Sequence, residues 1–187
     1  MGAGIPLTSD PFVTLGLPRT FRLDLRAAEK THRDLSRALH PDKYVSAGAS
    51  ERREALAKAV EVNEAWRVVR DPIRRAEALF ALSGVRVGDT HEPKPAPALL
   101  MDMMEQREAL AEARAKRDVS AIEKQLAAIT VRDEAVQEAL AHAFDESPLD
   151  GTKLTPFVAK LGELRYYRRF LEEASALLED LQSPGTS

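Results

Sequence analysis

The segment from Leu23 to Leu39 carries two chemically different stripes, and it constrains the fold more than any other part of the chain. If the segment is an α-helix, in which each residue turns by about 100°, its apolar stripe lies within an arc of about 80°. The basic stripe lies on the opposite side, within about 60°. The apolar stripe is Leu25, Ala28, His32, Leu35 and Leu39, and the basic stripe is Arg26, Lys30, Arg33 and Arg37. The pattern predicts a helix with one face in a core and a cationic face for solvent or an acidic partner.

A His-Pro-Asp tripeptide stops this helix. Pro41 cannot continue a helix, and it holds the residue before it in an extended conformation. We therefore expect His40 and Asp42 to stand on a loop, followed by the basic residue Lys43. Taken alone, the pair could belong to a metal site or to a hydrolase triad. However, the chain has no cysteine, its other histidines lack ligand spacing, and no Gly-x-Ser-x-Gly elbow or phosphate-binding loop occurs.

The order of motifs around the tripeptide resembles the J-domain co-chaperones. These motifs are DPFVTLGLP at residues 10–18, LHPDK at residues 39–43 and VNEAWRVVRDPIRRAEALF at residues 62–80. The resemblance implies a four-helix J-domain over residues 10–84. It also implies that His40, Pro41 and Asp42 contact a DnaK-type chaperone and trigger its ATP hydrolysis, while the basic stripe and Lys43 dock on an acidic surface of that chaperone. Catalysis would stay in the partner, so no catalytic residue, cofactor or metal is expected here.

The apolar positions predict how the helices of this domain pack. His32 stands where J-domains commonly carry a tyrosine, and we expect a packed histidine with a hydrogen-bonded tip. In the next helix, residues recur at a spacing of three or four and should pack on the apolar stripe: Leu56, Ala59, Val60, Asn63, Trp66 and Val69. A further helix should begin with Pro72 at its first position and bury Ile73, Ala76, Leu79 and Phe80.

Composition excludes several classes of protein. The net charge of −3 argues against a strongly basic nucleic-acid binder, and no apolar run approaches the ~20 residues that cross a bilayer. The absence of cysteine excludes a disulfide framework and fits a reducing cytoplasm, where we expect the protein to act. The first segment, residues 1–9, resembles neither a signal peptide nor a transit peptide.

The second half of the chain predicts another helical domain. Residues 85–97 contain Pro93, Pro95 and Pro97 and indicate a linker. Three amphipathic segments follow at 98–116, 119–144 and 154–181, and a tail covers residues 182–187. Three long helices joined by short turns predict an antiparallel three-helix bundle over residues 98–181, so that the whole chain belongs to the all-α class.

The first helix of the bundle has two distinct faces. Leu99, Met103 and Leu110 share an arc of about 40° and form a plausible core stripe. A separate arc of about 140° holds Leu100, Met101, Met104, Glu105, Glu108 and Glu112. Apolar side chains beside carboxylates are typical of a partner surface, in which methionine adapts to an irregular contact. The alternative is that Leu100 and Met104 simply belong to the core.

A second resemblance covers nearly the whole chain. A J-domain, a linker and a bundle beginning LLMDMMEQREALAE at residues 99–112 resemble the HscB (Jac) family of iron-sulfur cluster co-chaperones. In that family the positions of the second arc bind the scaffold protein on which clusters are built. The last helix supplies an aromatic to the same site. Lys160 stands at the aligned position here, and Phe157, about one turn earlier, is the candidate substitute.

The resemblance implies an adaptor that binds two partners. It would bind a cluster-loaded scaffold protein and deliver it to an HscA-type or DnaK-type chaperone while stimulating the ATPase of that chaperone, with the adaptor itself a monomer. One alternative is a J-domain co-chaperone for a different client, with the bundle as a dimerisation or substrate arm. A third hypothesis is an enzyme that uses His40 and Asp42, although no nucleophile or phosphate-binding loop accompanies them.

Overall fold

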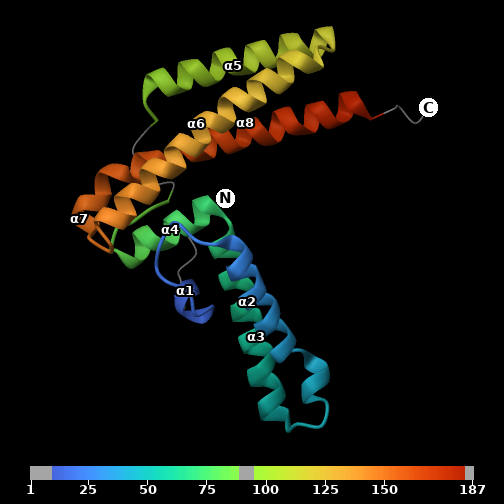
Figure 1. Cartoon of the computed structure of the whole chain (residues 1–187), viewed down its shortest axis with the longest axis vertical. Helices are drawn as coiled ribbons and strands as arrows, with labels where there is room; N and C mark the ends of the chain where they lie inside the picture. Colours follow the sequence, from blue (N-terminus) through green and yellow to red (C-terminus); the bar gives the residue numbers. More distant parts are fainter. Residues whose placement is uncertain (1–9, 89–94, 184–187) are drawn as a thin grey trace. The chain divides into compact units, whose positions relative to one another are not determined.

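The computed structural model describes residues 10–88 and 95–183, which form helices joined by turns and loops. Figure 1 follows the elements along the chain. Their bounds are α1 Pro11–Thr14, α2 Leu25–Ala38, η1 Pro41–Tyr44, α3 Ala49–Arg70, α4 Pro72–Leu82, α5 Pro97–Lys116, α6 Val119–Glu146, α7 Gly151–Leu154, η2 Thr155–Phe157 and α8 Val158–Gln182. The all-α class predicted from the sequence is confirmed. No helix within the described residues is long and apolar enough to span a membrane.

The chain divides into two compact units. Among the described residues, unit 1 contains residues 10–88 and 141–155, and unit 2 contains residues 95–140 and 156–183. The sequence-based division assigned residues 141–155 wholly to the bundle, whereas their contacts lie in unit 1. Three parts of the predicted organisation lie outside the described residues: the N-terminal segment 1–9, the middle of the linker and the last residues of the tail.

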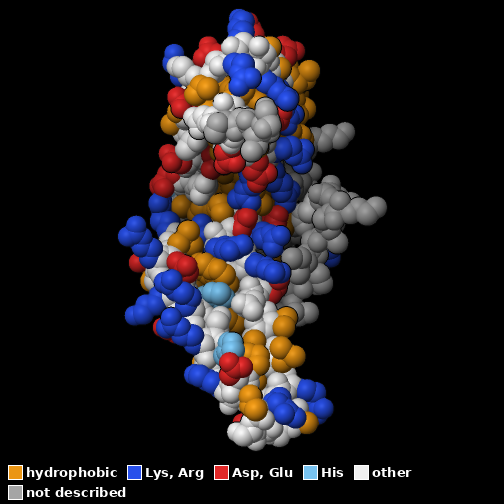
Figure 2. Space-filling model, turned by 90° about the vertical axis from the view of Figure 1, so that its right-hand side faces the viewer, with side chains coloured by type: hydrophobic (Ala, Val, Ile, Leu, Met, Phe, Trp, Pro, Cys, Tyr) orange, Lys and Arg blue, Asp and Glu red, His pale blue; other side chains and the backbone are white. Residues whose placement is uncertain are grey.

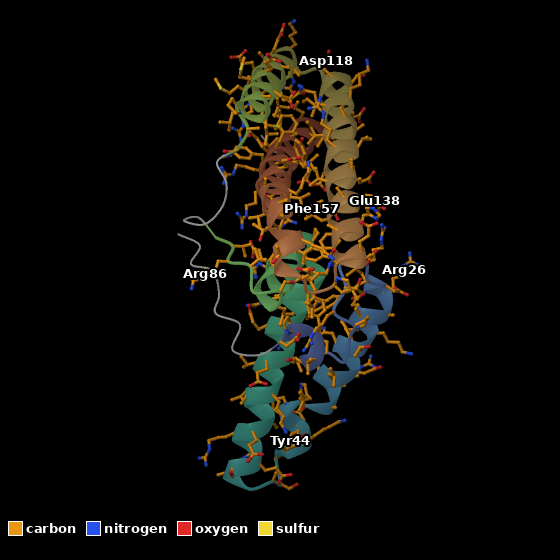
Figure 3. The ribbon with its side chains drawn as sticks, turned by 90° about the vertical axis from the view of Figure 1, so that its left-hand side faces the viewer. Arg26, Tyr44, Arg86, Asp118, Glu138 and Phe157 are labelled. Carbon is orange, nitrogen blue, oxygen red and sulfur yellow. The ribbon has the colours of Figure 1, made fainter. Side chains whose placement is uncertain are left out.

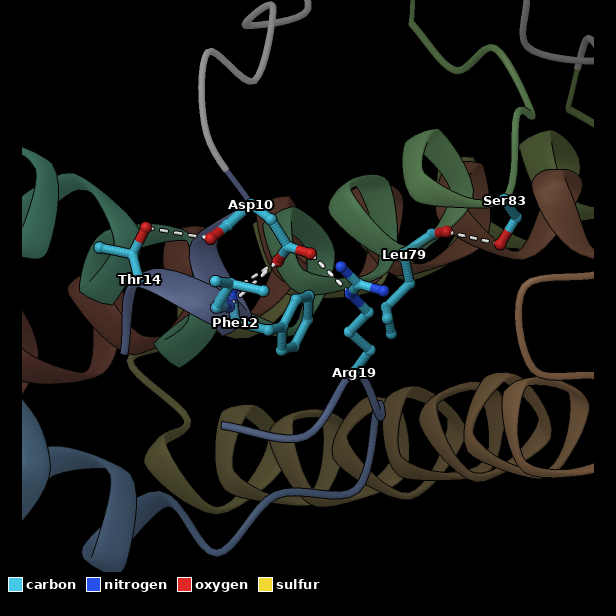
Figure 4. Close-up of polar contacts among 7 residues, drawn as sticks. Asp10, Phe12, Thr14, Arg19, Leu79 and Ser83 are labelled. Atoms are coloured by element: carbon cyan, nitrogen blue, oxygen red, sulfur yellow. Dashed lines mark hydrogen bonds and ion pairs between the residues drawn. The ribbon is translucent and has the colours of Figure 1, made fainter. Parts of the chain in front are cut away.

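The first turn of unit 1 is held by the side chain of Asp10. One carboxylate oxygen accepts hydrogen bonds from the backbone N–H groups of Phe12 at 2.9 Å and Val13 at 3.3 Å, and thereby caps α1. The other oxygen accepts from Nε of Arg19 at 2.6 Å (Figure 4). The cap fixes the direction of the short helix, and Phe12 is fully buried as a result.

Helices α2 and α3 pack against each other, as predicted. Asp24 caps α2, with its carboxylate accepting from the N–H groups of Arg26 and Ala27 at 3.0 Å. The ring of His32 stacks on Trp66 of α3, with ring centroids 5.3 Å apart. Its Nε2 lies 3.0 Å from Oδ1 of Asn63. The prediction of a packed histidine with a hydrogen-bonded tip agrees with this arrangement.

The predicted core face of α3 was wrong in part. The side chains of Leu56 and Val60 are 60% and 61% exposed, and Asn63 is exposed as well. Trp66 is half-buried, and Ala55, Val62, Ala65, Val68 and Val69 form the buried side instead. The physical reason is that α3 packs on both α1 and α2, so its buried arc lies between these two helices and turns Leu56 and Val60 away from it. A spacing of three or four residues identifies a stripe but not which stripe is buried.

Helix α4 begins at Pro72 and buries Ile73, Ala76, Leu79 and Phe80, as predicted, and Asp71 is its cap. Arg75 is buried on the same helix. Its guanidinium donates to the carbonyl oxygen of Val69 at 2.7 Å and lies 4.7 Å from the centroid of the Phe21 ring. Burial lowers the pKa of Arg75, and the charge of Asp71 opposes that change.

The end of α6 completes the core of unit 1. Phe144 packs against Phe80 and Phe21, with ring centroids 5.0 and 6.0 Å apart. Asp145 accepts from Nε of Arg22 at 2.9 Å. Gly151, at the start of α7, allows a close approach, because a Cβ atom there would meet the carbonyl oxygen of Ser83 at 2.3 Å. These contacts explain why residues 141–155 belong to unit 1.

Unit 2 consists of α5, α8 and the larger part of α6. Ile122, Ile129 and Leu140 of α6 and Leu161, Leu164 and Phe170 of α8 are fully buried. Polar contacts join the helices: Arg132 pairs with Asp102, and Arg107 lies 3.5 Å from Glu173. The helix predicted over residues 154–181 is divided into the end of α7, η2 and α8. Pro156 accounts for the break, because it removes one backbone donor from the helical ladder.

Phe144→Ala should destabilise unit 1 by about 3 kcal/mol, because it removes a buried ring that contacts two other aromatic rings. Urea unfolding followed by the fluorescence of Trp66, the one tryptophan of the chain, reports on this unit. Val131→Ala is the control, since Val131 lies on α6 and is 65% exposed. A loss of less than about 1 kcal/mol for Phe144→Ala would contradict the role of α6 in this core.

Candidate functional sites on the two units

The His-Pro-Asp tripeptide forms an ordered corner after α2. His40 has an extended backbone, with φ −62° and ψ 133°, as Pro41 requires. The expected loop is replaced by the 3₁₀ helix η1, which places Asp42 in a helical turn. Its regular turn arises because Pro41 occupies a first helical position, where no N–H is needed. All three side chains are exposed.

His40 caps this turn in a defined orientation. Its Nδ1 accepts a hydrogen bond from the backbone N–H of Asp42 at 3.3 Å and lies 3.4 Å from the carboxylate of the same residue. A neutral imidazole that accepts at Nδ1 carries its proton on Nε2. The exposed Nε2–H is then available to donate to a partner, so the corner presents a donor and a carboxylate side by side.

The cationic residues predicted from the sequence lie on the exposed side of α2. Arg26, Lys30, Arg33 and Arg37 are all exposed, and Lys43 is exposed on η1. Figure 3 places Arg26 near the start of α2 and Tyr44 at the far end of the helical pair. Arg33 and Arg37 lie 3.7 and 3.8 Å from Glu29 and Asp34. Such exposed pairs contribute little to stability, so the arginines can exchange these partners for others.

Helix α5 carries the second predicted surface. Leu100, Met101 and Met104 are 37%, 64% and 62% exposed, and Glu105, Glu108 and Glu112 are exposed beside them. Met103 and Leu110 are buried and Leu99 is half-buried, as the core stripe predicted. The alternative that Leu100 and Met104 simply belong to the core is therefore wrong. The exposed arc extends about 18 Å along α5, from Leu100 to Glu112.

One carboxylate of this arc has an internal partner. Lys116 donates a hydrogen bond to Glu112 over 2.6 Å, one helical turn away. This hydrogen bond, together with the positive charge of Lys116, lowers the pKa of the Glu112 carboxyl. The same contact raises the pKa of Lys116. Both groups are therefore charged at neutral pH.

Phe157 and Lys160 stand at the beginning of α8. Phe157 is half-buried at the end of η2, and Lys160 is held by both carboxylate oxygens of Glu163 at 2.9 Å. Figure 3 places Phe157 at the end of unit 2 away from Asp118, the residue that follows the α5 turn. The first turn of α5, with Leu100, lies at the end of that helix away from Asp118 too. A shared site of Phe157 and α5 stays a prediction.

Among residues 10–88 and 95–183, no three histidine or acidic side chains gather into a group that could hold a metal ion.

Comparison with known proteins places the chain in a family. A co-chaperone protein HscB homolog of Burkholderia cenocepacia is 31% identical over 183 residues, covering 96% of this chain and 99% of that protein. The chain belongs to the HscB co-chaperone family. A second HscB homolog, from an Azoarcus species, is 36% identical over 143 residues and covers 76% of this chain and 81% of its own length. Residues 95–175 match the HSCB C-terminal oligomerisation domain. HscB proteins are co-chaperones and not enzymes, which confirms the non-enzymatic prediction.

Solved HscB structures have the same fold. The chaperone HscB from Vibrio cholerae is 26% identical, has a TM-score of 0.80 and covers 92% of this chain and 99% of its own. The human co-chaperone protein HscB is 21% identical, with a TM-score of 0.78 over 90% of this chain and 82% of its own, and shows the fold alone. The predicted J-domain and C-terminal helical domain agree with the fold of these HscB proteins.

Sequence reasoning missed the exposed apolar pair Leu56 and Val60. One available signal was the set of arginines on the same helical arc, Arg52, Arg53, Arg67 and Arg70, because a buried stripe is rarely lined by so many cations.

Lys116→Gln should raise the pKa of Glu112 back toward its ordinary value, because the lysine causes the depression. A lowered pKa in the folded state stabilises the fold above the unfolded pKa, and this contribution is lost as pH falls through the folded pKa. An NMR titration of the Glu112 carboxyl carbon measures the change. Lys116→Arg keeps the positive charge and should keep the pKa low. Equal midpoints in the wild type and Lys116→Gln would contradict the assignment.

Proposed function

We propose that this HscB-family protein binds an iron-sulfur cluster scaffold protein and delivers it to an HscA-type or DnaK-type chaperone, whose ATPase it stimulates. The observation that carries the proposal is the pair of exposed surfaces with opposite charge on different units. Unit 1 offers a cationic helix with an ordered His-Pro-Asp corner, and unit 2 offers an apolar and acidic face.

The chaperone step rests on the corner after α2. The cationic side chains of α2 attract an acidic surface from a distance and set the register of docking. His40 and Asp42 then supply short, oriented contacts through Nε2–H and the carboxylate. A contact that is stronger with the hydrolytic conformation of the chaperone shifts the chaperone toward that conformation. In this role His40 acts by contact and not by proton transfer.

The scaffold step rests on the exposed arc of α5. Leu100, Met101 and Met104 supply apolar contact area, and methionine adapts its shape to an irregular partner. Glu105, Glu108 and Glu112 favour a basic rim on the scaffold protein. Binding both partners through one chain raises the effective concentration of the scaffold at the chaperone.

A second use of the α5 surface is self-association. The family domain that matches residues 95–175 is described as an oligomerisation domain, and exposed apolar residues suit a contact between copies. Sedimentation of the protein alone separates this possibility from scaffold binding, because self-association depends only on the concentration of this chain.

His40→Gln should abolish ATPase stimulation while leaving the fold and scaffold binding unchanged. The residue is exposed, so its replacement should alter the free energy of unfolding by less than about 0.5 kcal/mol. Single-turnover ATP hydrolysis by the chaperone, measured with increasing amounts of each variant, tests this. His142→Gln is a matched control, because His142 is also exposed and lies on α6. Full stimulation by His40→Gln would refute the trigger.

The triple change Leu100→Ser, Met101→Ser and Met104→Ser should weaken scaffold binding at least a hundredfold, because it removes the apolar centre of the contact. Calorimetric titration of the apo scaffold protein measures the dissociation constant. Val131→Ser provides a control with similar exposure in the same unit. Unaltered chaperone stimulation by the triple variant would show that the two surfaces act independently. Undiminished scaffold binding would remove α5 from the proposal.

A further inference from the structure

Two large apolar side chains on α3 are mostly exposed in unit 1. Leu56 and Val60 are 60% and 61% exposed, and they lie one turn apart on the same face. The buried side of α3 is formed by other residues. An exposed pair of this kind is a small apolar patch that a partner can cover.

The surroundings of the pair are cationic. On a helical wheel, an arc of about 100° of α3 contains Leu56 and Val60 and no acidic residue. Its other polar members are Arg52, Arg53, Asn63, Arg67 and Arg70. Arg67 lies 3.4 Å from Glu64, which stands just outside the arc. The complementary surface on a partner is therefore apolar at its centre and acidic around it.

This arc adjoins the cationic face of α2. Asn63, a member of the arc, contacts His32 of α2 through Oδ1, and Ser36 of α2 lies 3.3 Å from the same histidine nitrogen. These contacts place the α3 arc against His32 and Ser36 of α2, and on the helical wheel Ser36 lies on the side of His32 toward the cationic residues of α2. Figure 2 shows basic, histidine and hydrophobic side chains together on this side. The surface of α3 thus continues the proposed chaperone-binding surface.

We infer that Leu56 and Val60 form a second, apolar contact for the same DnaK-type chaperone, which would bring an apolar segment flanked by carboxylates onto α3. This inference rests on the proposed function. The division of labour follows from physics: the arginines of α2 attract the chaperone over a distance and are screened by salt, whereas the apolar contact acts only at close range and persists in salt.

The test compares two double variants of the full chain in binding to the purified chaperone at about 50 and about 300 mM salt. Leu56→Ser with Val60→Ser should raise the dissociation constant on the order of tenfold at both salt concentrations. Arg33→Glu with Arg37→Glu should weaken binding mainly at the lower concentration. Val13→Ser is the matched control, because Val13 is 63% exposed on α1 and lies outside the arc.

The outcomes separate this inference from the proposed function. If the wild type binds the chaperone and the serine pair binds equally well, the contact on α3 is refuted while the proposed function stands. If the wild type does not bind the chaperone at all, both fall. If the serine pair instead abolishes self-association of the wild type in sedimentation and leaves chaperone binding intact, a second copy occupies the patch and the inference is overturned.

Discussion

The aromatic contacts of Phe144 hold unit 1 together from a distant part of the sequence. Phe21 and Phe80 come from the first half of the chain, whereas Phe144 arrives at the end of α6. The guanidinium of Arg75 lies over the ring of Phe21, and Gly151 approaches Ser83 closely beyond the end of α6. The position of α4, and with it the end of α3 that α4 follows, depends on this core. The core of unit 1 is thus one that the N-terminal residues do not complete alone.

The two proposed surfaces differ in the physical force on which each depends. The α2 surface is charged and exposed, which suits rapid encounter and release. The α5 surface has apolar residues at its centre, which suits retention of a partner once it is bound. An adaptor that must find a chaperone repeatedly while keeping its client has use for both kinds of contact, and unit 1 and unit 2 keep them on separate helices.

The sequence predicted the helices well because the signals that start and stop a helix are local in sequence. Pro41 and Pro72 each mark a helix boundary, and the structure has boundaries at both. For the candidate sites, the exposure of the α2 cations and of Leu100, Met101 and Met104 agrees with prediction, although their partners stay proposals. Periodicity could not show that Leu56 and Val60 are exposed, because the buried side of α3 depends on where α1 packs. It also could not place Phe144, whose contacts are more than sixty residues distant in sequence.

The ion pair between Glu112 and Lys116 has a consequence for how a basic scaffold protein would bind. A cation that approaches Glu112 must displace Lys116, so the encounter exchanges one counter-charge for another. Such an exchange yields little net electrostatic free energy, and affinity then depends on how well the methionines of α5 fit the partner. Selectivity at that end of α5 would come from shape more than from charge, and the displaced lysine would be ready to return when the client departs.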